Sequence, residues 1–272
     1  MPEGDTIVRI ARTLAPILAG KIVTRCDSPL PGIARASLTG HVIDAVETLG
    51  KNLLIRFDDG RVLRTHLRMD GAWHLYRPDD RWKRDPSRAR IVLAVDGAVA
   101  VCFDAPVVEI LSAAEARFSP DLASLGPDIL ATDFDAAEAR RRLRARDDVA
   151  IGEAILDQTA IAGIGNVYKS EVLFVRRADP FAKIATLDDT ALDAIVAEVR
   201  RIMLHNVSPN RRGRVVRRDA PGQRLFVYGR VGRPCFVCEA RIETRRQGTL
   251  GRTTYFCRTC QSVRVPPRLA KR

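Results

Sequence analysis

The sequence lacks any run of eighteen or more apolar residues, the length that an apolar helix needs to cross a bilayer, so we expect no membrane partner. It also lacks a basic and then apolar stretch near its start, which argues against a secretory signal and for a cytoplasmic protein. Neither an internal repeat nor a low-complexity tract occurs. Hydrophobic residues still make up 46% of the 272 residues, which is enough for a packed core and excludes a disordered chain.

Acidic residues are scarce in the last quarter of the chain. Residues 205–272 contain 17 Lys and Arg but 3 Asp and Glu, a balance of +14. Because the whole chain carries +12, the residues before this segment sum to −2. We expect such one-sided charge to face a polyanion, most simply nucleic acid. The alternative is a basic tail that only keeps the protein in solution.

Cysteine is also scarce, with six residues in the chain. Cys26 and Cys102 stand alone in apolar, strand-like segments and are predicted to be buried free thiols of a reducing compartment. The other four form two C-x-x-C pairs with eighteen residues between them: Cys235 and Cys238, then Cys257 and Cys260. This spacing predicts one Zn²⁺ held by four thiolates, a site with no open position and therefore structural. Iron in a rubredoxin-like site is the alternative.

The first part of the chain combines one helix with strands. Apolar residues recur at helical spacing over residues 3–19. Residues 21–112 are strand-like, and turns with an Asp-Gly step at 58–60 and 96–97 predict two hairpins. Segment 24–40 is predicted to be a loop or a broken strand. An antiparallel β-sandwich flanked by helices follows from this order.

The rest of the chain is predicted to be helical and then to form a metal module. Recurring apolar positions place helices within residues 133–204, with Asp135 and Thr186 as predicted helix caps. The fold class is therefore α+β with two domains. The predicted parts are a β-sandwich domain at 1–125, a linker at 126–134, a helical domain at 135–224, the zinc module at 225–264 and a basic tail at 265–272.

Residues 158–171, QTAIAGIGNVYKSE, follow a helix-turn-helix pattern. Gly163 and Gly165 permit backbone conformations that other residues avoid. Asn166 is predicted to cap the second helix, where backbone N–H groups can hold a phosphate. The alternative is an ordinary helical hairpin.

The segment between the two cysteine pairs is predicted to be a hairpin with Arg245, Arg246 and Arg252 at its tip. Arginines on a loop fixed by a metal are suited to phosphate contacts. The alternative for each arginine is a solvated surface charge.

The opening MPEGDT raises a question about Pro2. Removal of Met1 would leave Pro2 as a secondary α-amine, and an ordinary α-amino group has a pKa of about 7.7–8.0. A helix N-terminus disfavours a cation, so the amine would be largely neutral and nucleophilic. On a sugar carbon it would form an iminium that keeps its charge, and Glu3 beside it could transfer protons. The alternative is that Pro2 merely begins a helix, with Glu3 as a favourable acid in its first turn.

These segments together resemble the formamidopyrimidine-DNA glycosylase and endonuclease VIII family over the whole chain. The resemblance is carried by PEGDT, LGKNLLIRF, LDQTAIAGIGNVYKSEVLF and VYGRVGRPCFVCEARIETRRQGTLGRTTYFCRTCQ. The glycine after PE is typical of the endonuclease VIII branch. The resemblance implies a monomeric base-excision-repair enzyme in the nucleoid, both glycosylase and abasic-site lyase, that removes oxidised bases from mainly double-stranded DNA. It also makes residues 135–224 a helix-two-turn-helix DNA-binding domain and 225–264 a zinc finger.

The same resemblance implies residue roles in catalysis. Pro2 would attack C1′ and form a covalent iminium, followed by β- and δ-elimination. Glu3 would protonate the sugar ring oxygen and assist proton transfer. Lys51 would contact a phosphate beside the lesion.

Further residues are implied in DNA binding. Asn166 would bind a backbone phosphate, and Arg252 would hold the phosphates beside the flipped nucleotide. Met69 would enter the space that the extruded base leaves, for which an unbranched apolar side chain is suited.

The sequence also departs from the family's pattern. Thr6 stands where many endonuclease VIII relatives carry an acid, and Asp5 points about 100° away from it on a helix. Residues 206–216 are unlike the loop that caps 8-oxoguanine, which favours oxidised pyrimidines as substrates. Three alternatives stay open: the same enzyme with formamidopyrimidine or 8-oxoguanine preference, a non-catalytic zinc-finger DNA-binding relative, and a zinc-ribbon module of a transcription or RNA-binding assembly.

Overall fold

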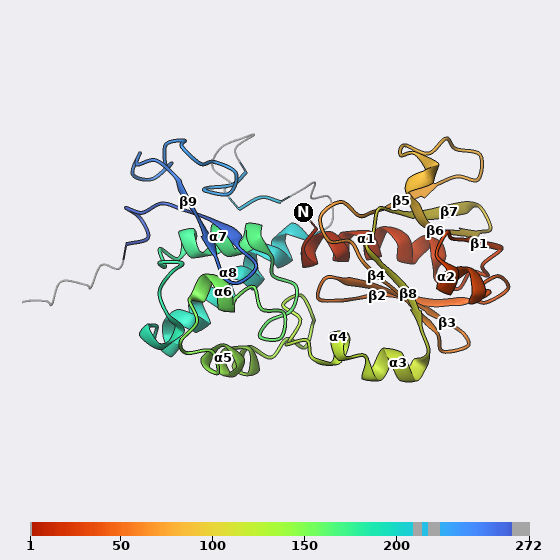
Figure 1. Cartoon of the computed structure of the whole chain (residues 1–272), viewed down its shortest axis with the longest axis horizontal. Coiled ribbons are helices and arrows are strands. Elements are labelled where there is room, and N and C mark those ends of the chain that lie inside the picture. Colours follow the sequence, from red (N-terminus) through yellow and green to blue (C-terminus); the bar gives the residue numbers. More distant parts are fainter. Residues whose placement is uncertain (1, 209–213, 217–223, 263–272) are drawn as a thin grey trace, which may run out of the picture. The chain divides into compact units, whose positions relative to one another are not determined.

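The computed structural model of the chain describes residues 2–208, 214–216 and 224–262. It divides into two compact units, Met1–Leu125 and Gly126–Arg272 (Figure 1). Each unit has its own hydrophobic core. None of the helices in the described part of the chain has the length and apolar character that a membrane span requires. Residues 209–213 and 217–223 of the predicted helical domain, and the whole of the basic tail predicted at 265–272, lie outside the described residues.

The first unit contains two four-stranded antiparallel sheets. One has the spatial order β1 (Arg25–Asp27), β6 (Ala89–Val95), β7 (Ala98–Phe103) and β5 (Ala72–Tyr76). The other has the order β2 (Ile43–Leu49), β3 (Asn52–Phe57), β4 (Val62–His66) and β8 (Val107–Leu111). Both predicted hairpins are confirmed, since β3 pairs with β4 and β6 pairs with β7 in antiparallel register.

Helix α1 (Gly4–Leu18) packs along this sandwich (Figure 1). Its buried face is Ile7, Ala11, Leu14 and Leu18, which join a core drawn from both sheets. Burial of each of the larger side chains, Ile7, Leu14 and Leu18, contributes about 1.5–3 kcal/mol. The prediction for residues 24–40 is wrong in part, because this segment holds both β1 and a short helix, α2 (Pro31–Arg35). The first unit also contains a short 3-10 helix, η1 (Pro86–Arg88), just before β6. It ends with the helices α3 (Ala113–Phe118) and α4 (Pro120–Ala123) after β8.

The second unit is helical and ends in a two-stranded hairpin. Its elements are α5 (Ala136–Arg144), α6 (Ile151–Ala154), α7 (Asn166–Val175), η2 (Ile184–Thr186), α8 (Asp189–Asn206), β9 (Glu243–Gln247) and β10 (Arg252–Phe256). The α+β fold class with a sandwich and a helical domain is therefore confirmed. Residues of the predicted linker are held within this unit, because the Gly126 N–H donates to Gln158 O and Ile129 is fully buried.

The predicted helix caps are confirmed in one case and wrong in another. Asp135 caps α5, since its carboxylate accepts the Glu138 N–H at 2.9 Å. Helix α8 is capped by Asp188, whose carboxylate accepts the Ala191 N–H at 2.7 Å, and not by Thr186. Asp188 is two residues nearer the helix and is as good a cap as threonine, which the spacing alone does not distinguish.

Candidate functional site

Pro2 and Glu3 stand before helix α1, which begins at Gly4. Glu3 is the N-cap residue in an extended conformation, and its carbonyl accepts the N–H groups of Thr6 at 2.9 Å and Ile7 at 3.2 Å. Pro2 therefore lies outside the helix, so the alternative that it is simply the first helical residue is wrong. The Glu3 side chain is fully buried at the end of the helix where backbone N–H groups point outward.

Asp5 is the second buried acid at this end of α1. Its carboxylate pairs with the Arg9 guanidinium at 3.0 Å and accepts the Thr6 hydroxyl at 3.3 Å. The Asp5 carboxylate is thus held by its own helix, which agrees with leaving it out of the predicted catalytic set.

Lys51 lies in the tight turn between β2 and β3. The next residue, Asn52, donates through its side chain to Leu49 O at 3.1 Å and accepts from Arg64 Nε at 2.9 Å. The other nitrogens of this buried guanidinium reach two carboxylates, Glu109 at 2.8 Å and Asp121 at 3.2 Å. These contacts fix both ends of the turn that presents Lys51. Sequence reasoning missed them because the partners are far apart in the chain.

His66, at the end of β4, is a half-buried histidine near Lys51 that the sequence analysis did not single out. It pairs in register with Asn52, and its Nδ1 accepts the Arg68 N–H at 3.2 Å. Burial, together with the charges of Arg68, Lys51 and Arg64, lowers the pKa of His66 to about 4. The neutral imidazole therefore carries its proton on Nε2 as a hydrogen-bond donor near Lys51. Its place at a strand end, just before the Met69 turn, is the signal that could have identified it.

Met69 is in the turn that follows β4, and its side chain is 56% exposed. An exposed methionine at a tip has no role in the core, which fits the predicted contact with a partner. Lys51 and Met69 are brought to the same end of the β3–β4 pair, because Asn52 and His66 are opposite one another.

In the second unit the structure brings Asn166 to the strand of Arg252. The N-cap of α7 is Gly165, so the prediction that Asn166 caps this helix is wrong. Its side-chain amide donates instead to Thr253 O at 2.7 Å, next to Arg252 at the start of β10. Only one of the two turn glycines has a positive φ, Gly163 at 98°, whereas Gly165 is extended.

A buried series of hydrogen bonds also holds β10 at Thr254, two residues after Arg252. Lys169 Nζ donates to Thr254 Oγ1 at 2.7 Å, and that hydroxyl donates to Gln247 Oε1 at 2.8 Å. The Gln247 amide then donates to Pro180 O at 2.8 Å. Helix α7 and both strands of the hairpin are thus joined by polar groups that are shielded from water. The sequence analysis did not predict this series of hydrogen bonds.

Another buried polar group of α7 fixes the segment that leads into the metal module. The Glu171 carboxylate accepts the N–H groups of residues 226, 227 and 228 at 2.7–2.8 Å. Burial raises the pKa of Glu171, although the three donors and the Arg230 charge oppose this.

The four cysteines predicted to bind a metal are brought together. Their Sγ atoms all lie within 4.8 Å of one another, with 3.9 Å between Cys235 and Cys260 and 3.4 Å between Cys238 and Cys257. Tetrahedral Zn²⁺ with Zn–S of about 2.3 Å places its sulfur ligands about 3.8 Å apart. The donor set and spacing therefore fit one four-coordinate metal ion.

The arginines of the hairpin are distributed differently from the prediction. Arg245 and Arg246 lie within β9, and the tip itself is the turn 248–251. The Arg245 guanidinium is over the Phe181 ring, 4.5 Å from its centroid. Arg252 alone of the three adjoins the tip.

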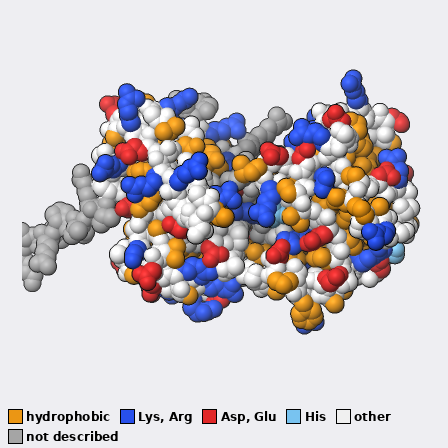
Figure 2. Space-filling model, viewed as in Figure 1, with side chains coloured by type: hydrophobic (Ala, Val, Ile, Leu, Met, Phe, Trp, Pro, Cys, Tyr) orange, Lys and Arg blue, Asp and Glu red, His pale blue; other side chains and the backbone are white. Residues whose placement is uncertain are grey.

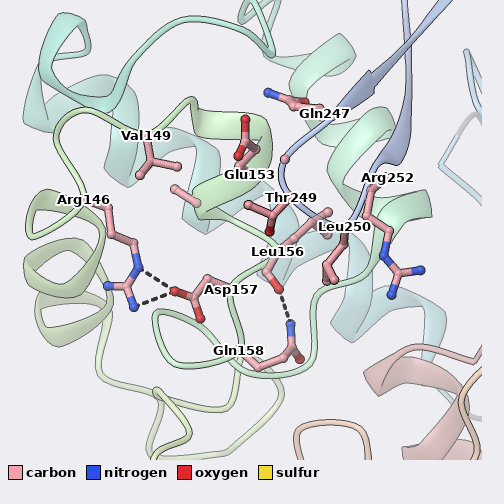
Figure 3. Close-up of a pocket in the computed structure, with 12 residues that line it drawn as sticks. Arg146, Val149, Glu153, Leu156, Asp157, Gln158, Gln247, Thr249, Leu250 and Arg252 are labelled. Carbon is pink, nitrogen blue, oxygen red and sulfur yellow. Dashed lines mark hydrogen bonds and ion pairs between the residues drawn. The ribbon is translucent and has the colours of Figure 1, made fainter.

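A pocket of about 590 Å³ lies between the turn after α6 and the hairpin tip (Figure 3). The Arg146 guanidinium pairs with the Asp157 carboxylate at 2.7 Å on one side, and Leu250 is on the other. Arg252 points away from this ion pair (Figure 3). On the face drawn in Figure 2, arginine and lysine side chains are interspersed with acidic ones.

Two family models match the chain. The one described as formamidopyrimidine-DNA glycosylase N-terminal domain matches residues 1–106, and the one described as formamidopyrimidine-DNA glycosylase H2TH domain matches residues 125–216. A crystal structure of Lactococcus lactis Fpg with DNA containing N7-benzyl-Fapy-dG superposes with a TM-score of 0.81 at 24% identity, covering 96% of this chain and 100% of that one. That likeness establishes the fold.

Curated relatives show the family. A probable endonuclease 8 2 of Streptomyces coelicolor is 40% identical over 98% of this chain and 96% of its own length. The DNA-(apurinic or apyrimidinic site) lyase Nei2 of Mycolicibacterium smegmatis is 38% identical over 97% of this chain and 100% of its own. The chain therefore belongs to the formamidopyrimidine-DNA glycosylase and endonuclease VIII family. It is an enzyme of the DNA glycosylase and abasic-site lyase class, and the predicted resemblance and enzyme class are confirmed.

Proposed function

We propose that this protein is a bifunctional DNA glycosylase and abasic-site lyase that removes oxidised pyrimidines and acts through Pro2. The observation that carries the proposal is the start of α1, where Pro2 stands outside the helix and the buried Glu3 is its N-cap. The sugar carbon is hidden in stacked DNA, so the damaged nucleotide must first be flipped out at a cost of a few kcal/mol. Lys51, Asn166 and Arg252 would bind phosphates around it, while Met69 fills the space it leaves.

The chemical steps use the Pro2 amine once Met1 is removed. The amine nitrogen attacks C1′, the C1′–N bond to the base breaks, and the base leaves with a proton. Glu3 protonates the ring oxygen, so the sugar opens to an iminium between C1′ and the Pro2 nitrogen. Loss of a C2′ proton then expels the 3′ phosphate, and a second elimination expels the 5′ phosphate. Hydrolysis of the conjugate returns the amine.

One Zn²⁺ bound by the four cysteines would be structural in this scheme. Four thiolates leave no open coordination position for water or substrate, so the ion would hold the fold of the hairpin that carries Arg252. Asn166 and Lys169 support the same strand from α7.

The test is borohydride trapping with untagged protein shown to begin at Pro2. Duplexes carrying an abasic site, thymine glycol, 5-hydroxycytosine or 8-oxoguanine are reduced with the enzyme, and the adduct is mapped by mass spectrometry. We expect an adduct on Pro2, faster with the oxidised pyrimidines than with 8-oxoguanine, and none with Pro2→Gly. An adduct on another residue, or undiminished trapping by Pro2→Gly, would show that Pro2 is not the nucleophile. Faster trapping on 8-oxoguanine would leave the chemistry intact and refute the pyrimidine preference.

A further inference from the structure

The turn that presents Met69 is closed by its own backbone. The Gly71 N–H donates to Leu67 O at 3.0 Å, and Arg68 adopts a positive φ of 49°. A Cβ on residue 71 would lie 2.7 Å from Leu67 O, so the close approach requires glycine. The Met69 side chain is therefore carried on a short turn whose stiffness depends on what holds its base.

Arg84 holds that base from another segment. Its Nη1 donates to Asp70 O at 3.0 Å, adjacent to Met69, and also pairs with the Asp104 carboxylate. Arg88 Nε donates to the other oxygen of Asp104 at 2.7 Å, and the Asp104 N–H donates to Arg88 O at 3.0 Å. Burial opposes the charge of Asp104, but hydrogen bonds from Arg88 and Arg84 prevail and lower its pKa. The carboxylate stays ionised and keeps Arg84 pointed at the Met69 turn.

The segment that carries Arg84 is itself anchored on the β1-β6-β7-β5 sheet. The Trp82 ring stacks on Tyr76 at 6.1 Å between centroids and meets the Phe103 ring edge-on at 5.7 Å. The Lys83 N–H donates to the Tyr76 hydroxyl oxygen at 3.0 Å. Arg84 thus joins the turn after β4, which is in one sheet, to a fixed point on the other.

We propose that Arg84 is a positioning residue for Met69, which it serves by fixing the Asp70 carbonyl to Asp104. This inference rests on the proposed function, in which Met69 enters the stack. Inserting a wedge between stacked bases costs free energy. If the turn that carries the wedge were flexible, it would also have to be ordered on binding, and that loss of conformational entropy would weaken the insertion of Met69. Arg84 itself needs no contact with the lesion.

The experiment compares Arg84→Ala, Met69→Ala and the double variant with the matched control Arg81→Ala, an exposed arginine of the same segment. Single-turnover excision is measured on a duplex with a base-paired lesion. Trapping is measured on a single-stranded abasic oligonucleotide, which has no stacked partner strand to open. 2-Aminopurine fluorescence opposite the lesion reports flipping. Melting temperatures identify any variant that fails to fold, and Asp104→Asn, which keeps the side-chain volume, then replaces Arg84→Ala.

We expect Arg84→Ala to slow duplex excision and the fluorescence change by about tenfold, the size of one lost charge-assisted hydrogen bond. Single-strand trapping should be unchanged, and the double variant should be no slower than Met69→Ala alone. Arg84→Ala behaving like Arg81→Ala, or multiplying its effect with that of Met69→Ala, would overturn the inference while the proposed function stands. Wild-type protein without any adduct, or Met69→Ala without effect on the duplex, would refute the proposed function or its wedge, and this inference with it.

Discussion

The two units hold their site residues by different physical means. In the first unit, Lys51 and Met69 are on short turns at strand ends, and the contacts of the buried Arg64 and the Arg84–Asp104 pair fix those turns. In the second unit, Arg252 begins strand β10, which α7 holds by hydrogen bonds to Thr253 and Thr254 and which leads to the four-cysteine cluster. The residues proposed for the chemistry and the phosphate contact proposed for Arg252 therefore depend on separate supports. Changes at Glu3 in the first unit should therefore alter bond breaking, and changes behind Arg252 in the second should alter affinity.

The sharpest test of this separation is Glu3→Gln. The amide keeps the volume of the buried side chain but cannot transfer protons, so we expect trapping and strand cleavage to fall by about a thousandfold. DNA affinity, measured by fluorescence anisotropy, should stay within about twofold of wild type, since an acid in this place makes no phosphate contact. Glu47→Gln, on the exposed face of β2, serves as the control and should retain activity. Full activity of Glu3→Gln would remove Glu3 from the mechanism.

Removal of the metal should instead lower DNA affinity more than the rate of bond breaking. We expect Cys238→Ser, or chelation, to lower the bound zinc and to weaken duplex binding by about a hundredfold, because several phosphate contacts are lost together. Metal content by mass spectrometry and anisotropy at fixed salt check this. Cys26→Ala is the control, since Cys26 lies outside the cluster and should leave both unchanged. Zinc retention and normal binding by Cys238→Ser would mean that the four cysteines do not form the site.

Thr254→Val probes the buried chain behind Arg252. Valine has the shape of threonine but removes the acceptor of Lys169 and the donor to Gln247, at a cost of about 1–3 kcal/mol in the free energy of unfolding. We expect DNA affinity to fall by about tenfold as β10 loosens, with the rate of the bound complex little changed. Thr253→Val is the matched control, because Asn166 uses only the backbone carbonyl there. Equal effects of the two substitutions would show that the hydrogen-bond chain does not position Arg252.

The features that the sequence predicted are those set by local spacing. The C-x-x-C pairs, the Asp-Gly hairpins and the apolar face of α1 each occupy one short stretch of chain. The supports of the site are long-range: Arg64 meets Asp121 across 57 residues, and Lys169 meets Thr254 across 85. No periodic pattern in the sequence predicts such long-range pairs. Asn166 was wrongly assigned as a cap because its side chain satisfies a carbonyl on β10 in place of its own helix.

The smallest expected effect concerns His66 in the first unit. Folded His66 stays neutral down to its pKa of about 4, because burial and the charges of Arg68, Lys51 and Arg64 oppose a further cation, whereas an unperturbed histidine takes a proton near pH 6.5. Between these values the unfolded state binds more protons, so stability rises with pH through this window. His66→Gln abolishes that contribution.

The melting temperature of wild type should therefore exceed that of His66→Gln by more at pH 7 than at pH 4.5, with each kcal/mol of difference worth about 2–4 °C. Arg81→Gln, which does not titrate in this range, should show a pH-independent difference. A difference that grows on acidification would mean that folded His66 is charged. The imidazole beside Lys51 would then be a second cation at this turn, and its charge would add to the phosphate contact proposed for Lys51.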